Sequence, residues 1–272
     1  MKNVVMCLVV MALLPVPGVA QANDLELLGF GADIHGSVGV TYQSQYVWRG
    51  FDIYDDDSAV QLTANLDLFD SGFGVTVAGH RANCSGHENG ERWDFNLYYQ
   101  NSLFNEDVFA TKYRVGWVYY AYPQLHPRAM DLQEFSGVLA WPKITGVQGL
   151  IPSYALVMFS PFYSASPGVG SNASGFLHIA ALDYSFAVPG AFPETPEQIF
   201  KIHSELVFND GVSPLSANVD HGWSHAVLGV STDIDLGYGV FLVPSVNYQI
   251  SMERSVNPDN EVWATVGARY NF

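Results

Sequence analysis

Two short segments combine a histidine with a serine, the residue types that hydrolases use as base and nucleophile. His35 and Ser37 are two positions apart, so they share one face of an extended strand. The sequence does not place an asparagine or an acid where it would orient the histidine, which argues against a catalytic set. In the segment His203-Ser204-Glu205, neighbouring side chains of a strand point to opposite sides, so His203 does not readily reach Ser204. We interpret His203 and Glu205 as a hydrogen-bonded pair on one polar face.

Metal-ligand residue types gather in two polar segments. One segment offers a thiol, an imidazole and two carboxylates from Cys84, His87, Glu88 and Glu91. The other is the run of aspartates at 55–57, which offers the oxygen ligands that calcium takes. Neither segment has the second ligand pair or the fixed loop pattern of a strong metal motif, so we predict no metal and no cofactor. Gly-rich phosphate loops and nucleotide-binding fingerprints are also absent from the sequence.

The elements that would position these residues are strands. In residues 262–272, apolar even-numbered positions alternate with mostly polar odd-numbered ones up to a terminal aromatic, as a transmembrane strand requires. The first of about twelve such segments runs from Ile34 to about Trp48, with Tyr42, Tyr46 and Trp48 on its apolar face. The others run from about 60 to 68, 73 to 77, 93 to 100, 109 to 119, 132 to 141, 149 to 163, 175 to 186, 200 to 208, 225 to 234 and 240 to 250.

Connections between the segments alternate between tight turns and long polar loops, which is typical of a membrane barrel with both termini at the short-turn end. The exception is the Pro-rich connection 187–198, which should be short. The tight turns are at 70–72 and 236–239, and the long loops are at 49–58, 83–92, 164–174, 209–222 and 251–260. Aromatic residues are expected in two interfacial girdles, the outer with Tyr46, Trp48, Trp93, Tyr119 and Trp223, and the inner with Phe69, Phe73, Trp141, Phe186, Tyr270 and Phe272.

The N-terminal residues have the pattern of a secretory signal peptide. Lys2 precedes an apolar run at 4–14, and an A-x-A cleavage motif ends at Ala22. The run is too short to span a bilayer as a helix. We therefore predict a signal peptide at 1–22 and a single barrel domain at 23–272. The 27 acidic residues against 11 basic ones give a net charge of −16, which argues against nucleic acid as a partner.

One part of the sequence resembles a known family. Residues 44–50 read Ser-Gln-Tyr-Val-Trp-Arg-Gly, an acidic stretch follows at 55–61, and an Asp-Ser-Gly-Phe turn follows at 70–73. With these motifs and its aromatic C-terminus, the chain resembles the TorF-family porins of Gram-negative bacteria. Trp48 and the Pro-rich connection 187–198 depart from the family's pattern. The resemblance implies a channel whose substrate is undefined.

Together, these patterns predict an all-β fold, a transmembrane antiparallel up-and-down β-barrel of about twelve strands in a bacterial outer membrane. Its polar inner faces carry charges of both signs and would line a narrow pore. Asp55, Asp56 and Asp57 would form an acidic outer mouth that concentrates cations. The predicted pore-lining residues are Arg49, Asp67, Asp94, Lys112, Arg114, Asp183, Lys201, His203, Glu205, Asp233 and Arg269.

We therefore expect a passive channel for small polar or cationic solutes and not an enzyme. One alternative is a lipid-modifying or lipid-hydrolysing barrel enzyme, which would need a histidine, a nucleophile and an orienting acid on the lipid-facing surface. The other is a structural or adhesive barrel without transport, whose lumen is filled by its own side chains. The expected partners are outer-membrane lipid, lipopolysaccharide, small polar solutes and the barrel-assembly machinery, for which Tyr270 and Phe272 would be the assembly signal.

Overall fold

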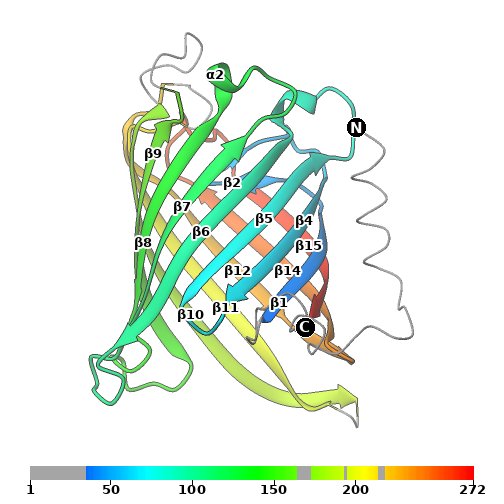
Figure 1. The fold of residues 1–272 in the computed structure, drawn as a ribbon, viewed down its shortest axis with the longest axis vertical. Coiled ribbons are helices and arrows are strands. Elements are labelled where there is room, and N and C mark those ends of the chain that lie inside the picture. Colours follow the sequence, from blue (N-terminus) through cyan, green and yellow to red (C-terminus); the bar gives the residue numbers. More distant parts are fainter. Residues whose placement is uncertain (1–34, 164–172, 193–194, 214–217) are drawn as a thin grey trace. The chain divides into compact units, whose positions relative to one another are not determined.

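Most of the described part of the chain forms one closed antiparallel sheet (Figure 1). The first strand, β1 (His35–Gln43), pairs with the last strand, β15 (Glu261–Asn271), and this pairing closes the barrel. The expected signal peptide, residues 1–22, lies outside the described residues. Across the residues that the structure describes, no helix is long and apolar enough to cross a membrane. The computed structural model describes residues 35–163, 173–192, 195–213 and 218–272.

Twelve strands cross the barrel, and each is antiparallel to its neighbours, as the sequence predicts. A short further strand, β13 (Ile234–Gly237), follows the tenth crossing and pairs with the eleventh. A closed sheet leaves no strand edge unpaired, which is what a barrel in a membrane needs. Between β1 and β15 the crossing strands are β4 (Ala59–Leu68), β5 (Phe73–Ala82), β6 (Arg92–Leu103), β7 (Thr111–Ala121), β8 (Leu132–Ala140), β9 (Leu150–Pro161), β10 (Gly175–Phe192), β11 (Thr195–Asp210), β12 (His221–Thr232) and β14 (Val240–Ser251).

Side chains alternate between the outer and inner faces of the wall. In β15, Val262 and Val266 are 64% and 49% exposed, whereas Glu261 and Gly267 are buried. Neighbouring side chains of a strand point to opposite faces, so the even-numbered residues of β15 face outward, as predicted. The apolar band of the barrel is therefore on its outside and the polar positions are inside.

The barrel has two different ends. The terminal end carries the start of β1, the end of β15 and the hairpin turns, and the loop end carries the longer loops, including the short helix α2 (Pro127–Met130). The Pro-rich segment 187–198 is not a plain connection, because β10 and β11 continue through it and pair Val188 with Gln198. This hairpin extends past the other strands at the terminal end (Figure 1). The prediction that one strand ends at about 186 and the next begins at 200 is therefore wrong.

The first strand is shorter than the sequence predicts. β1 ends at Gln43, and residues 44–58, which we call the inward loop, fold against the inside of the barrel. Two short strands in this loop, β2 (Val47–Trp48) and β3 (Phe51–Asp52), pair with each other. Tyr46 is only 4% exposed, and Trp48 packs against interior aromatic rings. The prediction that both aromatics belong to the outer girdle is therefore wrong, because burial inside the lumen produces the same apolar pattern as contact with lipid.

Apolar side chains fill part of the interior near the loop end. Trp48 of the inward loop packs against this cluster, together with Leu125 and Met130. Through Trp48, the cluster therefore packs the inward loop against β7 and β9. Its buried members are Val118, Tyr120, Tyr122, Leu132, Val157, Phe159, Ala173, Leu177, Ile179, Val207 and Val212.

Candidate functional site: the lumen and its inward loop

Arg49 anchors the inward loop to the barrel wall. Its Nη2 lies 2.9 Å from both carboxylate oxygens of Glu134 in β8. The Glu134 side chain is 3% exposed and also accepts a hydrogen bond from the Tyr120 hydroxyl at 2.7 Å. Burial acts to lower the pKa of Arg49, but Glu134, Tyr120 and Glu205 together raise it above its usual value, so the guanidinium stays charged. The loop is thus held by an ion pair that is largely removed from water.

Gly50 allows the loop to approach the opposite wall. Its φ of +91° belongs to the left-handed region that favours glycine. A Cβ atom at this position would lie 2.4 Å from Nδ1 of His225 in β12, which is closer than non-bonded atoms approach. The Gly50 carbonyl accepts a hydrogen bond from Nε2 of Gln249 in β14 at 2.9 Å. Glycine is therefore required for the close contact between the loop and β12.

Arg92, the first residue of β6, is the centre of a second anchor. Its Nη2 donates to the Tyr46 hydroxyl at 2.9 Å, and its guanidinium carbon lies 3.8 Å from the centroid of the Trp48 ring. Asp94 binds the Arg92 Nε at 2.7 Å and the Nε2 of His80 at 2.9 Å. Burial raises the pKa of Tyr46, so its hydroxyl stays neutral. The role of Arg92 is not predicted from the sequence, in which this residue belongs to the expected loop 83–92.

A third anchor joins the loop to the closing strand. Nε2 of Gln45 donates to Asp56 at 2.8 Å and to the buried carboxylate of Glu261 in β15 at 2.7 Å. Among the predicted acidic-mouth residues, Asp55 and Asp56 are both exposed, Asp56 accepts this bond, and Asp57 contacts His87 at 3.2 Å. The inward loop therefore contacts strands around the circumference of the barrel, namely β6, β7, β8, β9, β12, β14 and β15.

A cavity of about 160 Å³ lies beside the inward loop. Arg49, Glu205 and His225 line it with polar groups, and Leu177, Ile179 and Val207 are among its apolar lining residues. The cavity is large enough for several water molecules or a small solute.

A line of ionisable side chains continues from this cavity along the wall. Glu205 lies 3.8 Å from His225 Nε2 and 3.5 Å from His203 Nε2, and His203 Nδ1 lies 2.7 Å from Asp183. We call Asp183, His203, Glu205 and His225 the polar track. It runs over β10, β11 and β12. His203 and Glu205 lie within ion-pair distance, and the hydrogen bond of His203 is with Asp183.

The lining toward the terminal end is more open to solvent. Asp233 pairs with Lys201 at 2.9 Å and with Arg269 at 3.2 Å. The Arg114 guanidinium lies over the Tyr98 ring at 4.2 Å. Among the predicted pore-lining residues, Arg49 and Asp94 lie toward the loop end, and Glu205 lies between the two ends. The others are at inward positions in the half toward the terminal end, namely Asp67, Lys112, Arg114, Asp183, Lys201, His203, Asp233 and Arg269.

In the segment His203-Ser204-Glu205, the serine hydroxyl is not directed at the histidine. The Ser204 hydroxyl donates to the Leu182 carbonyl, away from His203. A different pair is in contact, since Ser224 Oγ lies 2.8 Å from His225 Nδ1, with Glu205 on the other side of the imidazole. Ser224 is only 1% exposed and does not line the cavity, so this hydroxyl is not placed to attack a substrate. The arrangement instead positions the His225 ring against the inward loop.

The comparisons with known proteins support the fold. No family model matches the chain, and no curated protein matches it. Among solved structures, the KdgM porin matches with a TM-score of 0.51 and 12% identity, covering 87% of this chain and 99% of that one. The NanC porin matches with a TM-score of 0.51 and 8% identity, covering 87% of this chain and 100% of that one. The chain therefore has the closed antiparallel barrel fold of these porins.

Proposed function

We propose that the chain is an outer-membrane channel through which small polar or cationic solutes diffuse passively. The observation that carries this proposal is the polar track, which leads from the cavity beside the inward loop toward the open lining at the terminal end. Hydrogen-bonding groups along a route replace part of the hydration of a polar solute. The inward loop narrows this route and would limit the size of the solute.

The proposed location follows from the barrel and from the N-terminal pattern. The chain would be secreted with removal of residues 1–22 and inserted with its termini in the periplasm and its loop end outside. The outward apolar band would contact outer-membrane lipid and lipopolysaccharide, and Tyr270 and Phe272 would engage the barrel-assembly machinery. The resemblance to the TorF-family porins supports the same assignment.

The charge of the chain favours cations over anions. The acidic excess of the sequence and the exposed Asp55 at the loop end would raise the local concentration of cations. One structural neighbour is described as the KdgM porin in complex with disordered oligogalacturonate, an anionic sugar chain. The lumen of this chain carries both signs of charge.

The alternative with specific support is a barrel that does not conduct. The buried apolar cluster around Tyr120 and Phe159, together with Trp48, fills part of the lumen near the loop end. If no continuous water path passes the inward loop, the barrel would serve as a structural or adhesive scaffold.

Single-channel conductance in a planar bilayer separates the two functions. The refolded chain should give discrete current steps, and a salt gradient should give a reversal potential of the sign for cation preference. The double substitution Trp48→Ala with Arg49→Ala should release the inward loop and enlarge the steps. A silent wild-type barrel whose released variant conducts would support the scaffold, and a reversal potential of the opposite sign would refute the cation preference.

A further inference from the structure

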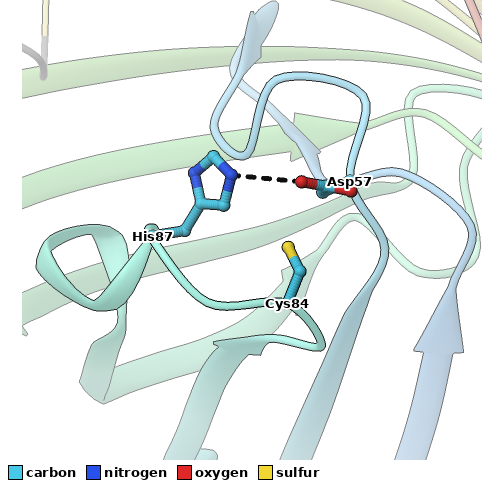
Figure 2. A group of neighbouring side chains, drawn as sticks. All are labelled: Asp57, Cys84 and His87. Carbon is cyan, nitrogen blue, oxygen red and sulfur yellow. Dashed lines mark hydrogen bonds and ion pairs between the residues drawn. The ribbon is translucent and has the colours of Figure 1, made fainter.

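Two loops at the loop end place three metal-ligand residue types together (Figure 2). Asp57 is near the end of the inward loop, just before β4, and Cys84 and His87 follow β5. The β4–β5 ladder ends at the pair Ala59 and Ala82, and the Asn83 amide donates to the Ser58 carbonyl at 2.9 Å. The two loops therefore leave adjacent strands at the same level, and the backbone fixes their separation.

The ligand atoms have the spacing that a single ion needs. The thiol sulfur of Cys84, a ring nitrogen of His87 and a carboxylate oxygen of Asp57 lie within 4.8 Å of one another. Oδ2 of Asp57 and Nε2 of His87 are 3.2 Å apart. Bond lengths of about 2.0–2.3 Å in a tetrahedral zinc site separate the ligand atoms by roughly 3.3–3.6 Å. Small side-chain rotations would therefore complete the geometry.

Neighbouring residues hold the cluster in place and leave its ligands available. The ring of Tyr54, which is fully buried, packs against the His87 ring with centroids 5.7 Å apart, and its hydroxyl donates to the Gly90 carbonyl at 3.2 Å. The nearby carboxylates have other contacts, because Glu88 accepts a bond from the Gly86 amide at 3.0 Å and Glu91 pairs with Arg81 at 3.1 Å.

We propose that Asp57, Cys84 and His87 bind one divalent transition-metal ion of the zinc class. Thiolate, imidazole and carboxylate are the ligand types that zinc takes, and three protein ligands leave a fourth position for water. The Cys84 thiol releases its proton to water on binding, so one thiolate and one carboxylate balance the two charges of the ion. This site goes beyond the proposed channel function and does not depend on it.

In the sequence, the three ligands of this site belong to two separate segments. Cys84 and His87 are in the segment with Glu88 and Glu91, and Asp57 is in an aspartate run suited to calcium. The fold joins one ligand of the second set to two of the first. Because Asp57 belongs to the inward loop, the bound ion would tie this loop to the segment after β5.

Cobalt(II) titration of the refolded full chain tests the site, since a thiolate bound to Co²⁺ absorbs in the near ultraviolet. Cys7→Ser is included in every variant, so that Cys84 is the sole thiol. The protein should bind one equivalent of Co²⁺ with this band, and Zn²⁺ should displace it. Zn²⁺ should also slow the reaction of Cys84 with a maleimide.

The ligand variants sharpen the test. Cys84→Ser should abolish the thiolate band. His87→Ala should weaken Co²⁺ binding by about 100-fold or more, because the loss of a residue that only supports a metal ligand can already weaken binding by that factor. The matched control is Asp210→Asn, because Asp210 and His221 form an exposed pair at 2.7 Å in which neither residue belongs to the proposed site. A wild-type titration without the band, or His87→Ala binding as tightly as Asp210→Asn, would overturn the site. Circular dichroism of each variant checks that the barrel has folded.

Discussion

The two halves of the lumen use the same kinds of charged side chain in opposite ways. Toward the loop end, the side chains of Arg92, Glu134 and His225 are 2%, 3% and 2% exposed. Toward the terminal end, Asp183 and Lys201 are each 47% exposed. Buried ion pairs hold structure because removal of one partner leaves the other desolvated, whereas exposed pairs are screened by water. The buried ion pairs of the loop half therefore hold the inward loop in place, whereas the charged side chains of the terminal half remain in contact with water.

Charged side chains in the two halves of the lumen also have different effects on a passing ion. In the terminal half, Lys201, Asp233 and Arg269 lie where they contact solvent, so their charge can act on a passing ion. In the loop half, Arg49 is paired with Glu134, and its charge is largely cancelled by that partner. The prediction from the sequence that a residue lines the pore therefore does not show whether that residue influences ion transport or the stability of the barrel.

The largest effect should come from Arg49→Ala. This change leaves the Glu134 carboxylate buried with only the Tyr120 hydroxyl as a neutral partner. Breaking a buried pair in this way costs about 3–5 kcal/mol, so the free energy of unfolding in urea should fall by that amount. The double substitution with Glu134→Gln should recover part of the loss. A loss below about 1 kcal/mol for Arg49→Ala would mean that water reaches the pair and that the loop half is not sealed.

Gly50→Ala should have an intermediate effect on stability and a visible effect on conductance. The new methyl group would collide with the His225 ring, and the backbone at φ +91° is strained for alanine. Overpacking of this kind costs about 1–3 kcal/mol, and the loop would shift from β12 toward the middle of the lumen or out of it. Single-channel recordings should therefore show a changed step size. Gly86→Ala is the matched control, because Gly86 has a positive φ of +106° but open space around it. Equal single-channel current steps in the two variants would contradict the close contact between Gly50 and His225.

The period of two along the strands was enough to predict the barrel, its strand count and its outward face. Positions such as Val262 and Val266 alternate with mostly polar residues over a length that suits a membrane-crossing strand, and the structure confirms them as outward. The same signal failed at Tyr46 and Trp48, since aromatic side chains buried inside the lumen and those facing lipid have the same alternation.

The candidate site was harder to predict from the sequence than the fold, because its contacts join distant segments. Arg49 and Glu134 are 85 positions apart, and Gly50 and Gln249 are 199 apart, so no local spacing connects them. The glycine after Arg49 was a usable signal, because an Arg-Gly pair that interrupts an alternating strand indicates a turn. Arg92 gave no such signal, since it closes a polar loop in the sequence and begins a strand in the structure.

The smallest effect on stability should come from Lys201→Ala, which removes one charge from the terminal half. Lys201 and Asp233 form an exposed pair, and Asp233 keeps Arg269 as a partner, so the unfolding free energy should change by only about 0.2–1 kcal/mol. The charge itself still acts on ions, so the reversal potential in a salt gradient should shift toward stronger cation preference. The shift should shrink at high ionic strength, because salt screens exposed charges. If Lys201→Ala destabilised the barrel as much as Arg49→Ala, the two halves would not differ in burial and the comparison between them would fail.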